Sequence, residues 1–175
     1  MKNLNKIFLA AIVMVGFASS AKAQATTTAT AAATIVTPIS IVNNVDMNFG
    51  NIAVQAGTGG TVALTASASP TRTAGGAGGV TLPNVDGTVT SAKFTVSGTA
   101  NYTYDITLPG VGSPVTLNSG GNTMTANSFI RSTAGTLSGA GAEVFYVGAT
   151  LTVAAAQPAG SYLSTTPFSV TVNYN

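Results

Sequence analysis

Several segments of the chain alternate between apolar and polar residues, which is the pattern of a β-strand with one buried face. In the longest of them, residues 143–153, every second side chain from Phe145 to Val153 is apolar. Both this segment and the end of the chain are therefore predicted to be strands that cover a hydrophobic core. At the end of the chain the inward side chains are those of Phe168, Val170, Val172 and Tyr174.

Shorter β-rich segments fill the rest of the chain. They span residues 35–42, 45–52, 61–66, 79–82, 92–97, 102–108, 115–117 and 122–130. Glycine-rich stretches at 57–60 and 75–79 and the pair Asp86-Gly87 are turn signals between them. After residue 23 no window shows the helical spacing of apolar residues. The sequence therefore predicts an all-β fold, an immunoglobulin-like or pilin-like antiparallel β-sandwich.

The same alternation predicts which side chains are buried. Tyr102 falls on the inward face of its segment together with Tyr104, and we expect it to belong to the core. The expected core comprises Phe49, Phe94, Tyr104, Ile106, Phe145, Val147, Leu151, Phe168, Val170 and Val172.

The first residues have the features of a secretory leader. Lys2 and Lys6 provide positive charge, residues 7–17 are apolar, and Ala21-Lys22-Ala23 is a small-x-small cleavage site. The apolar run is shorter than the roughly 20 residues that a membrane-spanning helix needs. We predict a cleaved signal peptide at 1–23, a flexible lead-in at 24–34 and a single domain at 35–175. The mature protein is then secreted, to the periplasm, the outer surface or the medium, and has no membrane span.

The two ends of the predicted domain raise the question of self-association. Ile35, Ile39 and Ile41 share one face of a segment that Pro38 interrupts, and proline confines a strand to an edge or a bulge. This segment is interpreted either as the first strand of its own domain or as a strand donated to a neighbouring copy. The candidate assembly residues are Ile35, Ile39, Ile41, Phe168, Val170, Val172 and Tyr174.

Charge is scarce, since only 6% of the residues are Asp, Glu, Lys or Arg. After the predicted cleavage the cations are Arg72, Lys93 and Arg131, set against Asp46, Asp86, Asp105 and Glu143. No basic patch remains that could bind a nucleic acid backbone. A nearly neutral surface and strand edges without lysine favour association.

The residues most used in catalysis are missing, because the sequence contains no histidine and no cysteine. By alternation or position at strand ends we expect Asp46, Asp105 and Glu143 to face solvent, and Asp86 to lie in a turn. We predict that the protein is not an enzyme and binds neither a cofactor nor a metal ion. The glycine-rich residues 73–79 precede a β segment and are interpreted as a turn. Tyr146 and Tyr162 are the candidate outward tyrosines for surface binding.

Several short motifs resemble a known family. They are Asp46-Met47-Asn48-Phe49-Gly50, Arg72-Thr73 followed by 78–82 (GGVTL), 147–153 (VGATLTV), 157–160 (QPAG) and 169–175 (SVTVNYN). In these motifs the chain resembles the secreted bacterial domain of unknown function 4402, which implies a secreted, immunoglobulin-like all-β domain without a known activity.

The end of the chain also resembles chaperone-usher pilins and spore-coat-U-like domains. Gly160 is followed by an alternating strand and by the penultimate Tyr174. That resemblance implies pairing of the last strand first with a periplasmic chaperone and then with the next subunit. Many such pilins carry a disulfide near their first strands, and this chain has none.

Two functions are compatible with these features. The first is a secreted, non-enzymatic structural or surface-assembly protein, such as a pilin-like or coat subunit, that associates with itself or with other surface subunits. The alternative is a monomeric extracellular adhesive or glycan-binding module.

Overall fold

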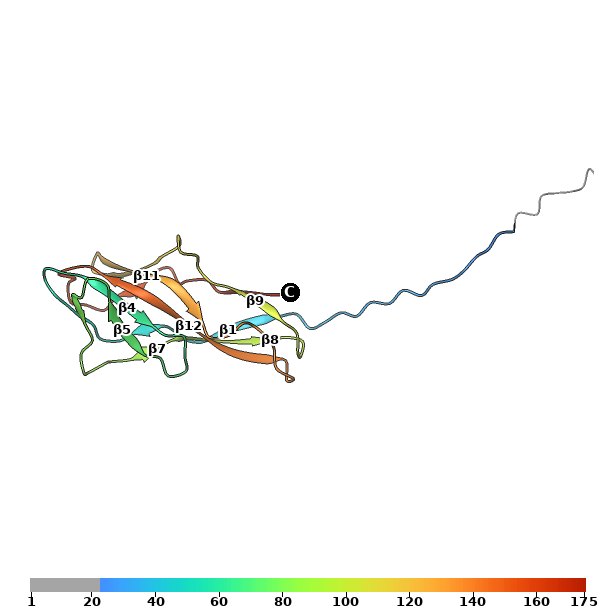
Figure 1. Ribbon diagram of the computed structural model, residues 1–175, viewed down its shortest axis with the longest axis horizontal. Helices are drawn as coiled ribbons and strands as arrows, with labels where there is room; N and C mark the ends of the chain where they lie inside the picture. Colours follow the sequence, from blue (N-terminus) through green and yellow to red (C-terminus); the bar gives the residue numbers. More distant parts are fainter. Residues whose placement is uncertain (1–22) are drawn as a thin grey trace, which may run out of the picture. The chain divides into compact units, whose positions relative to one another are not determined.

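The computed structural model describes residues 23–175, of which Val36–Asn175 form one compact unit (Figure 1). The predicted signal peptide at 1–23 lies outside the described residues except for Ala23. Residues 23–35 have no regular secondary structure and are exposed. No helix long and apolar enough to cross a membrane is found between residues 23 and 175.

The compact unit consists of β-strands joined by turns, which confirms the prediction of an all-β, sandwich-like fold. The strands are β1 (Ser40–Val45), β2 (Asn48–Phe49), β3 (Ala53–Val54), β4 (Gly60–Leu64), β5 (Arg72–Gly75), β6 (Val80–Thr81), β7 (Val89–Thr90), β8 (Ala92–Ser97), β9 (Tyr104–Thr107), β10 (Val115–Ser119), β11 (Asn122–Arg131), β12 (Ala142–Val153), β13 (Leu163–Ser164) and β14 (Thr171–Tyr174).

The largest sheet has the order β1-β8-β12-β11-β10-β13, and all its pairings are antiparallel. Its central strand β12 pairs with β11 on one side, while its two halves have different partners on the other side (Figure 1). Residues 142–147 pair with β8, and residues 150–153 pair with β4. Gly148 lies at this change of partner, where a Cβ atom would overlap the backbone of residues 64–66. Separate two-stranded sheets are formed by β9 with β14, β2 with β7 and β3 with β6.

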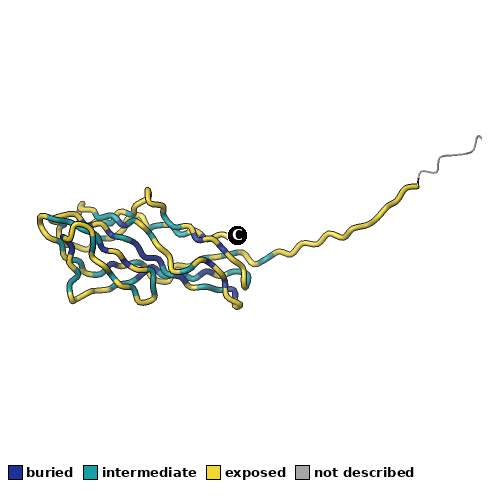
Figure 2. Tube along the Cα trace, viewed as in Figure 1, coloured by how far each residue is buried: buried dark blue, intermediate teal, exposed yellow. Residues whose placement is uncertain are grey.

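The buried side chains of β12 belong to two hydrophobic clusters. Figure 2 shows the buried residues, in dark blue, along the strands of the compact unit. Phe145 and Val147 belong to the first cluster, with strands β8, β9 and β14, and the Phe145 ring stacks on Phe94 with centroids 5.3 Å apart. Leu151 and the neighbouring apolar side chains of β12 belong to the second cluster, with β4. Phe129 packs against both clusters and links them. One alternating strand therefore holds the two halves of the domain together.

Most of the predicted core is confirmed. Phe49, Phe94, Tyr104, Ile106, Phe145, Val147, Leu151 and Val172 are buried, and Phe168 and Val170 are half-buried against the first cluster. The prediction for Tyr102 is wrong, because this side chain is 44% exposed. Strand β9 begins only at Tyr104, so the alternation does not extend back to residue 102.

Candidate functional site

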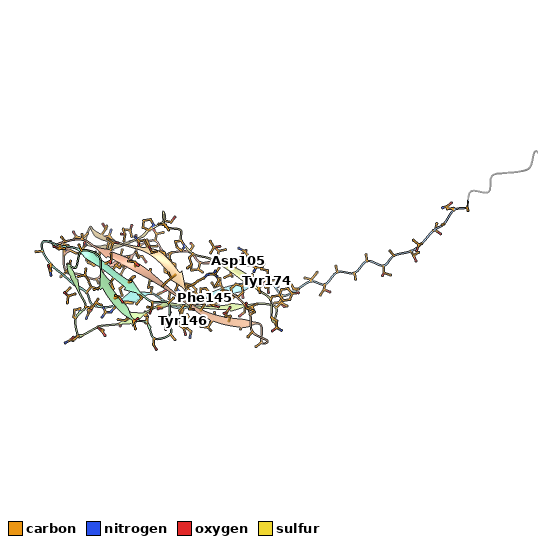
Figure 3. The ribbon with its side chains drawn as sticks, viewed as in Figure 1. Asp105, Phe145, Tyr146 and Tyr174 are labelled. Atoms are coloured by element: carbon orange, nitrogen blue, oxygen red, sulfur yellow. The ribbon has the colours of Figure 1, made fainter. Side chains whose placement is uncertain are left out.

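The C-terminal strand β14 pairs with β9 and with no other strand in the described part of the chain. The register places Val172 opposite Ile106 and Tyr174 opposite Tyr104. The ladder covers only the second half of the predicted strand, although the alternating burial of side chains continues back to Phe168. Figure 3 shows Tyr174 close to Asp105 on this pair of strands.

Hydrogen bonds define which edge of β14 is free. The Tyr104 N–H donates to the Gly135 carbonyl at 3.1 Å, so it points away from β14, whereas the Asn175 N–H donates to the Thr103 carbonyl at 3.4 Å. In an antiparallel pair, backbone groups of alternate residues face the partner. The N–H and C=O groups of Thr171 and Asn173 therefore face β9. Those of Val172 and Tyr174 point to the opposite edge, which pairs with no strand within residues 23–175.

The hydroxyl of Tyr174 joins the last strand to the first part of the domain. It accepts a hydrogen bond from the Thr99 N–H at 2.7 Å and donates one to the Thr37 carbonyl at 2.8 Å. The Tyr174 ring packs edge-on against Tyr102 with centroids 5.6 Å apart. Gly98 leaves room for the hydroxyl, which a Cβ atom there would overlap. The penultimate tyrosine is thus a structural clamp.

The N-terminal segment closes its own domain in this structure, because β1 pairs with β8 in antiparallel register. Ile39 and Ile41 are half-buried against the first cluster, together with Phe168, Val170 and Tyr174. Ile35 is 97% exposed and precedes β1, which begins at Ser40 rather than at residue 35. The prediction of one strand over residues 35–42, with the three isoleucines on one face, is therefore wrong for its first part.

A groove of about 560 Å³ opens where β9 and the approach to β14 separate. We call it the fork groove. Its lining includes Leu108, Val115 and the half-buried Phe168, whose ring lies 4.9 Å from that of Phe129. The other lining side chains are threonines, serines and prolines, without a charged group. The full lining comprises residues 107–109, 113–116, 165–169 and 171. Sequence reasoning missed this groove, which forms between segments about sixty residues apart.

The candidate binding tyrosines are not brought together. Tyr146 is half-buried on β12, directly opposite Lys93 of β8. Tyr162 precedes β13, which lies three positions from β12 in the sheet, or roughly 14 Å at the usual strand spacing. The Tyr162 hydroxyl donates to the Pro158 carbonyl at 2.8 Å and accepts from the Gln157 amide at 2.9 Å. Tyr162 therefore holds the turn before β13.

Arg72 bridges three segments. Its Nη1 donates to the carbonyls of Phe49 at 2.9 Å and Asn51 at 2.7 Å, and its Nη2 forms an ion pair with the Asp86 carboxylate. The arginine side chain is only 4% exposed, whereas that of Asp86 is 65% exposed. Gly50, with φ of 69°, passes so close that a Cβ atom would overlap the Asp86 carbonyl. Asp86 lies in the loop between β6 and β7, and its carboxylate has a structural partner. Asp86-Gly87 does not form the predicted hairpin turn, because β6 and β7 pair with other strands.

Glu143 faces the protein, so the expectation that it points to solvent is wrong. Its carboxylate accepts hydrogen bonds from the Tyr104 hydroxyl at 2.8 Å, the Thr133 hydroxyl at 2.5 Å and the Thr136 N–H at 2.9 Å. Burial, together with the hydrogen bond to Glu143, raises the pKa of Tyr104 well above its usual range. The Glu143 carboxylate, which accepts from Tyr104, Thr133 and Thr136, thus fixes the loop before β12 to strand β9. We call this set of hydrogen bonds the latch.

The remaining acids are Asp46 and Asp105. Asp46 and Asp105 are exposed, as expected. In the part of the chain that the structure describes, no three Asp, Glu, His or Cys residues are grouped closely enough to hold a metal ion.

The family-like motifs occupy structural positions. Residues 46–50 and Arg72 meet in the arginine bridge, and Gly79 passes so close to the Thr58 backbone that a Cβ atom would overlap it. Residues 147–153 span the change of partner in β12 and include the residues 150–153 that pair with β4. Gln157 donates to the Thr123 carbonyl at 3.2 Å. The last motif is β14 with its tyrosine clamp.

Comparison with known protein families identifies the family of the chain. Residues 39–174 match the family described as Domain of unknown function (DUF4402). No curated protein and no solved structure matched the chain. Because the matched residues cover well over half of the sequence, the protein belongs to the DUF4402 family.

Proposed function

We propose that the protein is a secreted, non-enzymatic structural subunit of a surface assembly, such as a pilus-like fibre or a coat. Copies associate by adding strands to each other's sheet edges. The observation that carries the proposal is the free edge of β14, where the backbone groups of Val172 and Tyr174 have no strand partner in residues 23–175. Unpaired strand edges are templates for pairing with another chain.

The sequence around this edge lacks the usual protection against such pairing. Soluble proteins place lysine, other charges or proline on exposed edges. β14 (TVNY) and β1 (SIVNNV), which is also an outer strand of its sheet, contain none of these. A periplasmic chaperone that covers the β14 edge during export would be compatible with the same geometry.

The chemistry of the chain supports a structural role over an enzymatic one. Glu143 and Arg72 are engaged in hydrogen bonds that hold loops and strands together. Histidine and cysteine, the most versatile catalytic side chains, are absent from the sequence. Few charges and a nearly neutral balance also weaken the repulsion between copies.

The test compares charge placed on the free edge with the same charge elsewhere. Asn173→Lys adds a lysine to β14, and Thr152→Lys adds one to an exposed site on β12, whose neighbours on both sides are paired. In the native producer, wild-type protein should give SDS-resistant ladders and filaments that bind antibody to this chain. Asn173→Lys should abolish both, and Thr152→Lys should retain them.

Other results would redirect the proposal. A wild-type protein that stays monomeric at high concentration, forms no surface ladder and retains a glycan would contradict assembly and favour the adhesive module. Mass spectrometry of the exported protein checks the predicted maturation, which should leave Gln24 as the first residue. Recovery of an intact Met1 only from the cytoplasm would contradict secretion.

A further inference from the structure

We infer that the fork groove binds residues 24–35 of a second copy of this chain in an extended conformation. This inference rests on the proposed function and adds to the β14 edge a second site, and the segment that enters it, through which copies join. The groove is separate from the free edge of β14, because it opens on the side where β9 and the approach to β14 part.

The walls of the groove offer unpaired backbone groups. Within the described chain, residues 165–170 make no backbone hydrogen bond, and residues 108–114 make only the turn bond from Ser113 to Gly110. Ser169 continues the alternation of Thr171 and Asn173, whose backbone groups face β9. Ser169 lines the groove, and β9 has ended at this point. If the extended geometry of β14 continues back to Ser169, its N–H and C=O are directed into the groove. An extended segment could therefore continue the ladder that β9 and β14 leave unfinished.

The lining favours a peptide over a carbohydrate or a charged ligand. Sugar and anion sites present amide, carboxylate or cationic side chains, and this groove presents hydroxyls, prolines, Leu108, Val115 and Phe168. Recognition must come mainly from backbone hydrogen bonds and from shallow apolar contacts. Those contacts suit an uncharged segment of small side chains. Pro109, Pro114 and Pro167 donate no N–H and limit the ladder to the positions between them.

Residues 24–35 (QATTTATAAATI) have the required properties. They carry no charge, and between Gln24 and Ile35 they contain only threonine and alanine. Residues 23–35 are exposed and have no regular secondary structure, and Ile35 is 97% exposed. Fully extended, such a segment spans about 40 Å, which is more than the roughly 17–20 Å of an average strand. It is therefore long enough to enter a groove on a neighbouring molecule.

A cysteine-based crosslink tests the contact directly, because the full chain contains no cysteine. Two single variants of the full chain are purified and mixed under mild oxidation: Thr28→Cys in the lead-in and Thr166→Cys in the groove wall. The matched control replaces the second variant with Thr73→Cys, an exposed threonine on β5. Binding raises the local thiol concentration, so the groove pair should form the mixed disulfide at least about tenfold faster than the control pair.

Competition identifies the occupant. An excess of the synthetic peptide QATTTATAAATI should suppress the groove crosslink, and maltohexaose, a neutral oligosaccharide, should not. Equal crosslinking rates for the groove and control pairs would overturn the inference. It would also be overturned by suppression with maltohexaose but not with the peptide. In a double Thr28→Cys, Thr166→Cys variant, a disulfide formed only within one chain would overturn the assignment to a second copy.

The two proposals fail in different ways. If surface ladders and filaments form but the groove pair does not crosslink, the groove inference is wrong and the structural function stands. If the groove pair crosslinks and the peptide competes, but the producer shows no ladder or filament, the groove inference stands and the surface-assembly function is wrong.

Discussion

Replacing Arg72 with methionine should destabilise the domain strongly, although Arg72 is a member of neither hydrophobic cluster. The side chain is 4% exposed and its guanidinium group holds the carbonyls of Phe49 and Asn51 together with the Asp86 carboxylate. Methionine preserves most of the buried aliphatic volume and removes the three interactions. The variant therefore isolates the contribution of the guanidinium group.

The expected loss of unfolding free energy depends on how exposed each of the three partners of Arg72 is. A hydrogen bond from a charged donor contributes about 1.5–3 kcal/mol, and a buried carbonyl left without a donor adds a desolvation penalty. The Phe49 carbonyl is partly buried, whereas the Asn51 carbonyl is exposed and can bind water instead. The Asp86 side chain is 65% exposed, so its ion pair contributes at most about 1 kcal/mol. We expect Arg72→Met to lower the free energy of unfolding by about 2–4 kcal/mol.

Chemical unfolding measures this difference, followed by far-UV circular dichroism and by the fluorescence of the five tyrosines, since the chain has no tryptophan. Asp86→Asn is the matched variant and should lose less than about 1 kcal/mol. Arg72→Lys should fall between the two, because an ammonium group cannot reproduce the planar geometry of the guanidinium group. Equal losses for Arg72→Met and Asp86→Asn would refute the reasoning, since the ion pair would then dominate. A neutral Arg72→Met would show that the bridge is dispensable.

Three further predictions test the core, the clamp and the latch. Phe145→Ala should lower the free energy of unfolding by about 3–5 kcal/mol, whereas Thr150→Ala on the opposite face of β12 should change it by less than about 1 kcal/mol; similar losses would contradict the assignment of faces. Tyr174→Phe removes the two hydrogen bonds of the clamp and should lose about 1–3 kcal/mol. Its control Tyr146→Phe removes a hydroxyl without a hydrogen-bond partner in the described chain and should be nearly neutral. Because the pKa of Tyr104 is raised in the folded state, the unfolded chain releases this proton first, so stability should be unaffected below about pH 10 and fall above it. Ultraviolet titration should show one late-ionising tyrosine that Tyr104→Phe removes, and its persistence in that variant would contradict the assignment.

The alternation of apolar and polar residues predicted correctly which side chains are buried in segments that form a continuous strand. In β12 the inward side chains from Phe145 to Val153 are buried as expected, because side chains in a pleated strand must point to opposite faces. The same alternation also places Glu143 on the inward face, which the sequence-based prediction overlooked. Glu143 is two residues before Phe145 and therefore shares its inward face, where Tyr104 and Thr133 supply donors for the carboxylate.

Features that depend on contacts between distant segments could not be predicted in this way. Nothing near Arg72 in the sequence indicates that carbonyls more than twenty residues upstream will surround it. The division of the core into two clusters follows from the change of partner along β12, which periodicity does not show. The fork groove likewise depends on where the β9–β14 ladder stops, and alternation alone placed the beginning of that last strand too early.

The positions of the family motifs explain why membership of the DUF4402 family defines a fold and leaves the function open. The arginine bridge, the glycine at the partner change in β12 and the clamp of Tyr174 each hold segments of the domain together. The lead-in at 24–35 and most walls of the fork groove lie outside the motifs, whereas Val172 and Tyr174 of the free β14 edge lie within the last motif. The motifs therefore account for the framework and for the strand edge through which we propose that copies join, and they leave open what enters the fork groove.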